Sequence, residues 1–294
     1  MSNRTLSLIL ALCLLLPAGA GAQSADPEEE YLRLERDETG ASVSLQAPIL
    51  AFEPPDGEPQ GLRVDLVGAI HIGDPSYYAA LNERFAGYDA VLYELVAPEG
   101  ARPRPNAAPG NLVSGMQLGI TRLLDLTFQL DEIDYTLPNF VHADLTPREL
   151  AQSMSERGES TFTYLSRLFT GSADDYALEA AAADGPGILA TLFSPDRPRL
   201  LKTLMASSML DVESFSRMIE GESGSALVGA RNARALEVLA DRIRGGDRRI
   251  AIFYGVAHLP DLAQRLESDI GLTRRAASWI DAWDLRADAS NRGE

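Results

Sequence analysis

The stretch VDLVGAIHIGDPSYYAALNERFAGYDAVLYELV, Val64 to Val96, decides how this chain is expected to fold. An apolar run ends at Gly68 and leads to His71, and a second apolar run, Ala90 to Val96, contains Glu94. The residues between the two runs have helical periodicity. A strand, a helix and a strand of this length predict a crossover between parallel strands.

The helix of this unit has a recognisable beginning and end. Asp74 is expected at the N-cap and Pro75 in the first turn, and Gly87 is expected to end the helix. One face is apolar, through Tyr77, Tyr78, Leu81 and Phe85. Because parallel strands end at the same edge of a sheet, the unit predicts that His71 and Glu94 lie close together there.

The first 22 residues read as a secretory signal. Arg4 is the basic flank, Leu6 to Leu16 the apolar core, and Ala20-Gly21-Ala22 a small-residue cleavage site. We therefore expect an exported protein, periplasmic or secreted, with a disordered tether over residues 23–30. Cys13 lies inside this leader, so the mature chain is expected to contain no disulfide, catalytic thiol or cysteine-bound metal.

Composition narrows the class of partner. The net charge is −17 with 45% hydrophobic residues, which suits a well-packed acidic domain. Binders of nucleic acid or anionic membranes usually carry a basic patch, so neither partner is expected. No run after the leader approaches the roughly 20 apolar residues that a membrane span needs. The expected partner is a peptide or a small molecule.

The remaining segments predict one domain over residues 31–294 with a helical insertion at about 112–222. Two strands are expected in Tyr31 to Pro54, a third from Ile250 to Tyr254 and a closing strand from Ala277 to Leu285. Within the insertion, helical patterns cover Leu112 to Leu130, the segment capped by Thr146-Pro147-Arg148-Glu149, and one long segment from about Pro198 to Glu220. A helix from about Ser225 to Arg244 follows. The fold class is therefore α/β, a mixed sheet built from strand–helix–strand units.

The three histidines all fall where a strand or strand-like segment meets a loop. His71 and His258 share one sequence pattern: a buried strand, then Gly-x-x-His, then a helix with proline in its first turn. We expect Gly68 and Gly255 to allow a sharp backbone turn that aims each imidazole over the strand end. Glu94 is costly to bury without a cation.

Two imidazoles and a carboxylate are a common ligand set for a divalent metal, so His71, Glu94 and His258 predict a site for Mn, Co, Zn or Fe. A metal in such a site would activate water. His142 is predicted as an auxiliary ligand or proton shuttle. Asp144 is expected either to orient an imidazole by a hydrogen bond or to bind the metal directly.

Arg231-Asn232 admits two interpretations, the solvated face of a helix or part of the site, where Arg231 would stabilise an oxyanion. Trp279 and Trp283 are expected to pack rather than to bind a sugar. Asp65 is expected to form a hydrogen bond or an ion pair with a neighbouring residue.

The ordered motifs resemble the TraB/PrgY/GumN family: Gly68-Ala69-Ile70-His71, then Glu94, then Arg231-Asn232, then Gly255-Val256-Ala257-His258. That family is grouped with the Tiki metalloproteases and, more distantly, with erythromycin esterases and ChaN-like haem-binding proteins. The resemblance covers about residues 64–96 and 225–285. It implies an EreA/ChaN-like fold of paired α/β repeats, with the two histidines and the glutamate as functional residues.

Three functions follow from the residues and the resemblance together. The leading hypothesis is an exported metal-dependent hydrolase, most plainly a peptidase, as among the Tiki relatives. The second is a metal-free hydrolase of the erythromycin-esterase type, in which a histidine is the general base and Glu94 orients it. The third is a periplasmic binder of haem, metal or peptide without enzymatic activity.

Overall fold

The computed structural model describes residues 31–103, 124–159, 194, 196–210, 212, 216 and 225–286. The predicted leader and tether lie outside these ranges, as does most of the predicted insertion. Within the described residues, no helix is long and apolar enough to cross a membrane.

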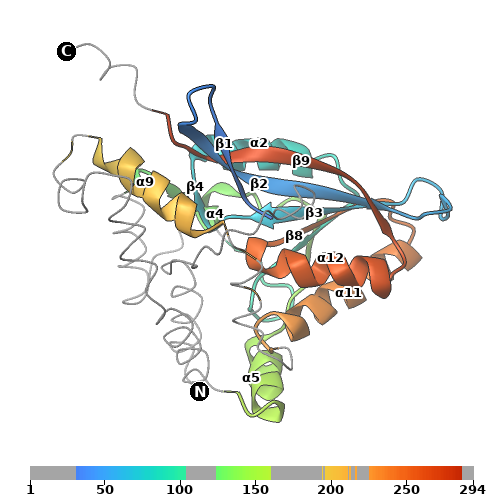
Figure 1. Ribbon diagram of the computed structural model, residues 1–294. Coiled ribbons are helices and arrows are strands. Elements are labelled where there is room, and N and C mark those ends of the chain that lie inside the picture. The colour runs from blue at the N-terminus through green and yellow to red at the C-terminus, as the bar shows by residue number, and fades with distance from the viewer. Residues whose placement is uncertain are drawn as a thin grey trace.

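One mixed sheet forms the body of the fold (Figure 1). The strand order is β1-β2-β3-β8-β5-β7, and β9 also pairs with β2. Three strands on one side are antiparallel to their neighbours, whereas β3, β8, β5 and β7 run parallel. The strands are β1 (Arg33–Arg36), β2 (Ser42–Glu53), β3 (Arg63–Ala69), β5 (Ala90–Tyr93), β7 (Phe140–His142), β8 (Arg249–Gly255) and β9 (Thr273–Asp284). The predicted α/β class with a mixed sheet is confirmed.

The two strands of the organising unit are parallel but are not neighbours. β8 lies between them, with Leu66 of β3 and Leu92 of β5 both paired to Ile252 of β8. β8 follows β5 by more than 150 residues of chain, so local pattern could not place it. His71 and Glu94 are nonetheless expected at the same edge of the sheet, because the carboxyl ends of all these strands share that edge.

Helix α2 (Pro75–Phe85) forms as predicted, with Tyr77, Tyr78, Leu81 and Phe85 buried. Asp74 occupies the N-cap position, but its side chain makes no capping hydrogen bond. It pairs instead with Lys202 and accepts from the backbone N–H of Asp284. The predicted capping role of the Asp74 side chain is therefore wrong, because two tertiary partners take its oxygens.

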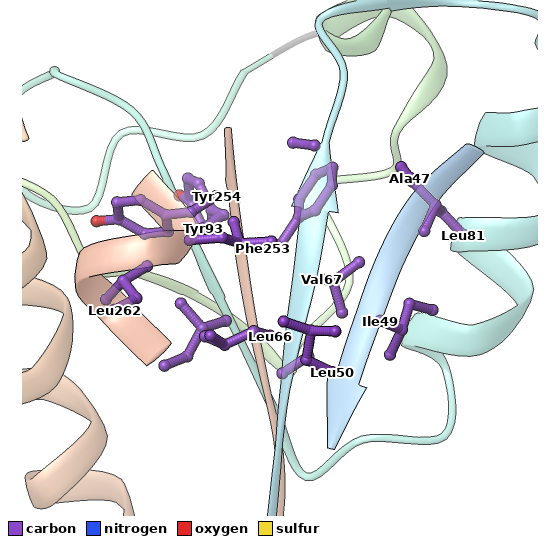
Figure 2. Packing of buried hydrophobic residues seen from close by; sticks show 14 of the residues in the cluster. Ala47, Ile49, Leu50, Leu66, Val67, Leu81, Tyr93, Phe253, Tyr254 and Leu262 are labelled. Carbon is purple, nitrogen blue, oxygen red and sulfur yellow. The ribbon is translucent and has the colours of Figure 1, made fainter. Parts of the chain in front are cut away.

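Helices cover both faces of the sheet (Figure 1). On one face, Phe85 of α2 packs against Phe253, with ring centroids 4.9 Å apart. On the other, a short 3-10 turn η1 (Val256–His258) leads into α12 (Leu259–Ser268), beside α11 (Gly229–Arg244). Figure 2 shows both layers: Leu81 lies beside Ala47 on one side of the sheet, and Leu262 lies on the other.

The insertion is only partly as predicted. The capping box at Thr146 and Glu149 is present and opens α5 (Pro147–Glu156). A helix was expected over Leu112 to Leu130, but its last part is β6 (Thr127–Phe128), which pairs with β4 (Ile72–Gly73), followed by α4 (Gln129–Glu132). Residues 112–123 lie outside the described residues. The long segment expected from about Pro198 to Glu220 begins with α9 (Arg197–Ser208). Most of its remaining residues lie outside the described ranges.

Candidate functional site

Each of the four parallel strands delivers a polar side chain to the same edge of the sheet. Glu94 directly follows β5, His71 lies two residues beyond β3 and His258 three beyond β8. His142 ends β7, with Asp144 two residues on. These residues are distant in the sequence but lie close together because the four strands run in the same direction.

Arg231 of α11 joins three of the delivered residues. Its Nε and Nη2 donate to the two carboxylate oxygens of Asp144 at 2.9 and 2.6 Å, and Nη2 also donates to Glu94 Oε1 at 2.7 Å. Nη1 faces the Leu227 carbonyl at 3.5 Å and His258 Nε2 at 3.4 Å. Arg231 is only 3% exposed, so the interpretation as a solvated helix face is wrong.

These contacts engage every N–H of the guanidinium. Arg231 carries five such donors, and the partners above account for all of them. In this arrangement no donor remains for a substrate oxyanion. Arg231 acts instead as the buried cation that the sequence required beside Glu94.

Glu94 is held at both oxygens and stays ionised. Oε1 accepts from Arg231, and Oε2 accepts from the backbone N–H of Gly255 at 2.7 Å. Burial opposes ionisation, but Arg231, His258, His71 and the Gly255 N–H outweigh it and hold the pKa of Glu94 well below its usual range. Glu94 is thus a fixed negative charge and a weak base.

His258 is held as a neutral imidazole. Its Nδ1 lies 2.6 Å from Asn232 Oδ1, an atom that only accepts, so Nδ1 carries the proton. The Asn232 amide donates to the His258 carbonyl and to Asp261, which fixes its orientation. Burial, reinforced by Arg231 and opposed by Glu94, lowers the pKa of His258 to about 4.

His71 is held by a residue that the sequence did not single out. Nδ1 of His71 lies 3.0 Å from Oε1 of Gln129, and the Gln129 backbone N–H donates to the His71 carbonyl at 2.9 Å. Gln129 is 4% exposed and follows β6, whose antiparallel pairing with β4 brings it beside His71. Among the described residues, Nε2 of His71 has no hydrogen-bond partner, and the side chain is partly exposed.

The two motif glycines matter because they lack a Cβ, and not because of their backbone conformation. Neither has positive φ, so the expected reason for glycine at these positions is wrong. A Cβ on Gly68 would lie 2.9 Å from Cδ of Pro48 and 3.0 Å from Cγ1 of Val256, which makes Gly68 a packing residue. A Cβ on Gly255 would instead lie 3.2 Å from Glu94 Oε2 and 3.5 Å from His71 Nε2.

His142 stands apart from this network. Its Nε2 donates to the Leu95 carbonyl at 2.6 Å, and its ring lies against Tyr93 at 5.7 Å. In the described part of the chain, no hydrogen bond joins it to Glu94 or Arg231. Its role as auxiliary ligand or proton shuttle stays a prediction.

The three predicted metal ligands do not fit a three-ligand site as they stand. Glu94 Oε1 and His258 Nε2 are 3.6 Å apart, and the guanidinium of Arg231 contacts both atoms. A metal there would meet a buried cation. Over the described ranges, no group of three or more acidic, histidine or cysteine side chains is arranged to hold a metal.

No protein-family model, curated protein or solved structure matches this chain. The resemblance to the TraB/PrgY/GumN family therefore stays a prediction, and the site is argued from its own geometry.

The sequence located His71, Glu94 and His258 because strand ends and a buried charge are visible in a pattern. Arg231 was left with two interpretations, because a helical pattern does not show which face of the helix is buried. Gln129 gave no such signal, since it follows a two-residue strand that was expected to be helix. Only the tertiary pairing of β4 with β6 brings it to the site.

Proposed function

We propose that this protein is a hydrolase of ester or amide bonds, with His71 as general base and Glu94 as the charge that supports it. One observation carries the proposal: Nε2 of His71 and Oε2 of Glu94 both border the space above Gly255, the position that a Cβ would take there, at 3.5 and 3.2 Å from it. A nitrogen lone pair and a fixed carboxylate that face the same point are what the activation of water requires.

The assignment of the base follows by comparing the candidates. The depressed pKa of Glu94 makes it a poor proton acceptor at neutral pH. Nε2 of His258 faces the Arg231 guanidinium, so a proton there would meet a positive charge. His71 is the remaining imidazole of the cluster, and an ionised Glu94 beside it favours the imidazolium that proton transfer creates.

The reaction then proceeds through a tetrahedral intermediate. Water attacks the carbonyl carbon as its proton passes to Nε2 of His71, and the carbonyl π electrons move to oxygen. The C–O or C–N bond breaks when these electrons return, and His71 gives its proton to the leaving group. Arg231, Asp144 and Asn232 position Glu94 and His258 without touching the substrate.

The resemblance extends the proposal to an EreA/ChaN-like fold, a peptide substrate and an exported, periplasmic or secreted location. These extensions depend on the motif order, whereas the assignment of His71 and Glu94 depends on the geometry. Metal dependence, the leading prediction from sequence, requires Arg231 to release His258 and Glu94 Oε1. The metal-free hydrolase is therefore the form that we propose.

The decisive experiment measures hydrolysis of p-nitrophenyl esters and of a fluorescence-quenched peptide library by residues 23–294. We expect turnover in the wild type and a loss of at least about 100-fold in kcat/KM for His71→Gln, because general-base catalysis contributes that much. Arg234→Gln is the matched control. Arg234 lies on the same helix as Arg231 but pairs at the surface with Glu237, so its variant should retain activity within about twofold.

Exhaustive dialysis against 1,10-phenanthroline and EDTA, with elemental analysis, separates the alternatives. Activity that survives without bound metal supports the proposal. Activity that is lost and then restored by Mn, Co, Zn or Fe would replace it with the metal-dependent form. Unchanged turnover in His71→Gln, or haem or peptide binding without any cleavage, would overturn it.

A further inference from the structure

We propose that Gln129 is a positioning residue that fixes which ring nitrogen of His71 carries the proton. The inference rests on the proposed function for its catalytic meaning, but the tautomer itself is a property of the folded protein. The observation behind it is a buried chain of contacts, from Tyr135 through Gln129 to His71.

The orientation of the Gln129 amide sets the direction of this chain. Its Nε2 donates to the Tyr135 hydroxyl oxygen at 2.8 Å, which leaves Oε1 facing His71 Nδ1 at 3.0 Å. An amide oxygen only accepts, so Nδ1 must be the protonated nitrogen of a neutral His71. The lone pair is then on Nε2, the nitrogen that borders the space above Gly255.

Several contacts keep Gln129 where it is. The backbone N–H of Gln129 donates to the His71 carbonyl, so the two residues are linked through both main chain and side chain. Asn82 of α2 donates to the Glu132 carbonyl and accepts from the Asp134 N–H, which ties the α4 segment to the sheet domain. Tyr135 is 1% exposed and packs against Tyr93, with ring centroids 5.2 Å apart.

His258 repeats the same device on the other side of Glu94. There Asn232 Oδ1 accepts from Nδ1. Each of the two motif histidines is therefore held by a buried side-chain amide at Nδ1. Only the His71 lone pair is free of a cation, because Nε2 of His258 faces Arg231.

The test records ¹⁵N spectra of the histidine rings at a pH where both rings are neutral. The chain has three histidines, so single His→Gln variants assign every signal. In the wild type we expect His71 and His258 in the Nδ1–H tautomer. In Gln129→Leu, His71 should become a mixture of tautomers while the His258 signals stay unchanged, which also reports that the fold survives.

Kinetics give the second readout. Gln129→Leu should lower kcat about 10- to 100-fold with little change in KM, by analogy with the loss of a hydrogen-bond partner of a metal-bound imidazole. Gln129→Glu should recover part of that loss, since a carboxylate also accepts from Nδ1.

The outcomes separate this inference from the proposed function. If His71 keeps the same tautomer in Gln129→Leu, the inference is overturned whatever the activity. If the tautomer changes as expected but His71→Gln still turns over substrate, the proposed function fails and the tautomer assignment stands. Tyr135→Phe provides a second variant should Gln129→Leu not fold: it removes the hydroxyl that orients the amide and should also mix the tautomers.

Discussion

One buried cation organises the residues of the site. Arg231 neutralises one of its two carboxylate partners, Glu94 and Asp144, whose side chains are 7% and 0% exposed. A surplus of one negative charge remains among these groups while His258 is neutral. Such a surplus is stable only beside further hydrogen-bond donors, and the Gly255 N–H supplies one at Glu94 Oε2.

The neutral state of His258 makes stability depend on pH. Its folded-state pKa is lowered to about 4, while the unfolded value is near 6.5. Below pH 6.5, His258 is therefore protonated in the unfolded chain but stays neutral in the folded protein. The free energy of unfolding falls on acidification, and this loss levels off near pH 4. At pH 5 the neutral state of His258 should lower the free energy of unfolding by about 2 kcal/mol relative to pH 7.5.

Urea unfolding of the wild type and His258→Gln at pH 7.5, 6 and 5 checks this. The variant will be less stable at every pH because it loses the Asn232 contact, so the slope is the readout. We expect a flatter dependence on pH in His258→Gln. Equal slopes would mean that His258 titrates normally in the folded state.

At the scale of elements, the two Gly-x-x-His turns carry glycine for different reasons. A Cβ on Gly68 would collide with Pro48 of β2 and Val256 of η1, so Gly68→Ala forces two elements apart. We expect a loss of about 1–3 kcal/mol in the free energy of unfolding. The three atoms nearest to a Cβ on Gly255 belong to the side chains of Glu94, His71 and His258. Gly255→Ala should therefore cost less stability and lower kcat/KM at least about 10-fold, because it narrows the space beside Nε2 of His71.

Urea unfolding and ester hydrolysis on both variants test this contrast. Gly229→Ala is the control, since its Cβ would meet only Arg265 Nη2, at 3.7 Å. It should change neither quantity appreciably. Parallel losses of stability and activity in Gly68→Ala and Gly255→Ala would show that the two glycines have one common role.

Local pattern predicted the elements well and their neighbours poorly. The apolar runs that became β3, β5 and β8 were read correctly, because burial on both faces leaves a continuous apolar signature. The strand order was not predicted, since the position of β8 between β3 and β5 is a long-range choice. The short β4–β6 pair was missed for the same reason, and Gln129 was missed with it.

At the scale of the whole molecule, a nearly buried ion pair joins the insertion to the sheet domain. Lys202 of α9 contacts Asp74 at 2.9 Å, and their side chains are 9% and 16% exposed. Asp74 lies three residues after His71 and also accepts from the Asp284 N–H at the end of β9. In Figure 1, α9 lies near β4, apart from α11 and α12. This contact therefore connects three parts of the chain that are remote in sequence.

We expect the pair to contribute measurably to stability, because removing one partner leaves the other charge poorly solvated. A double-mutant cycle with Lys202→Met and Asp74→Asn should give a coupling energy of about 1–3 kcal/mol in urea unfolding. The exposed pair Arg234–Glu237 is the control, and the same cycle there should give less than about 0.5 kcal/mol. In Lys202→Met, hydrogen exchange should accelerate in the amides of α9 while those of α11 keep their protection, because α9 would detach without the sheet domain unfolding. Equal acceleration in both helices, or coupling no larger than that of the surface pair, would show that Lys202 and Asp74 do not hold the insertion in place.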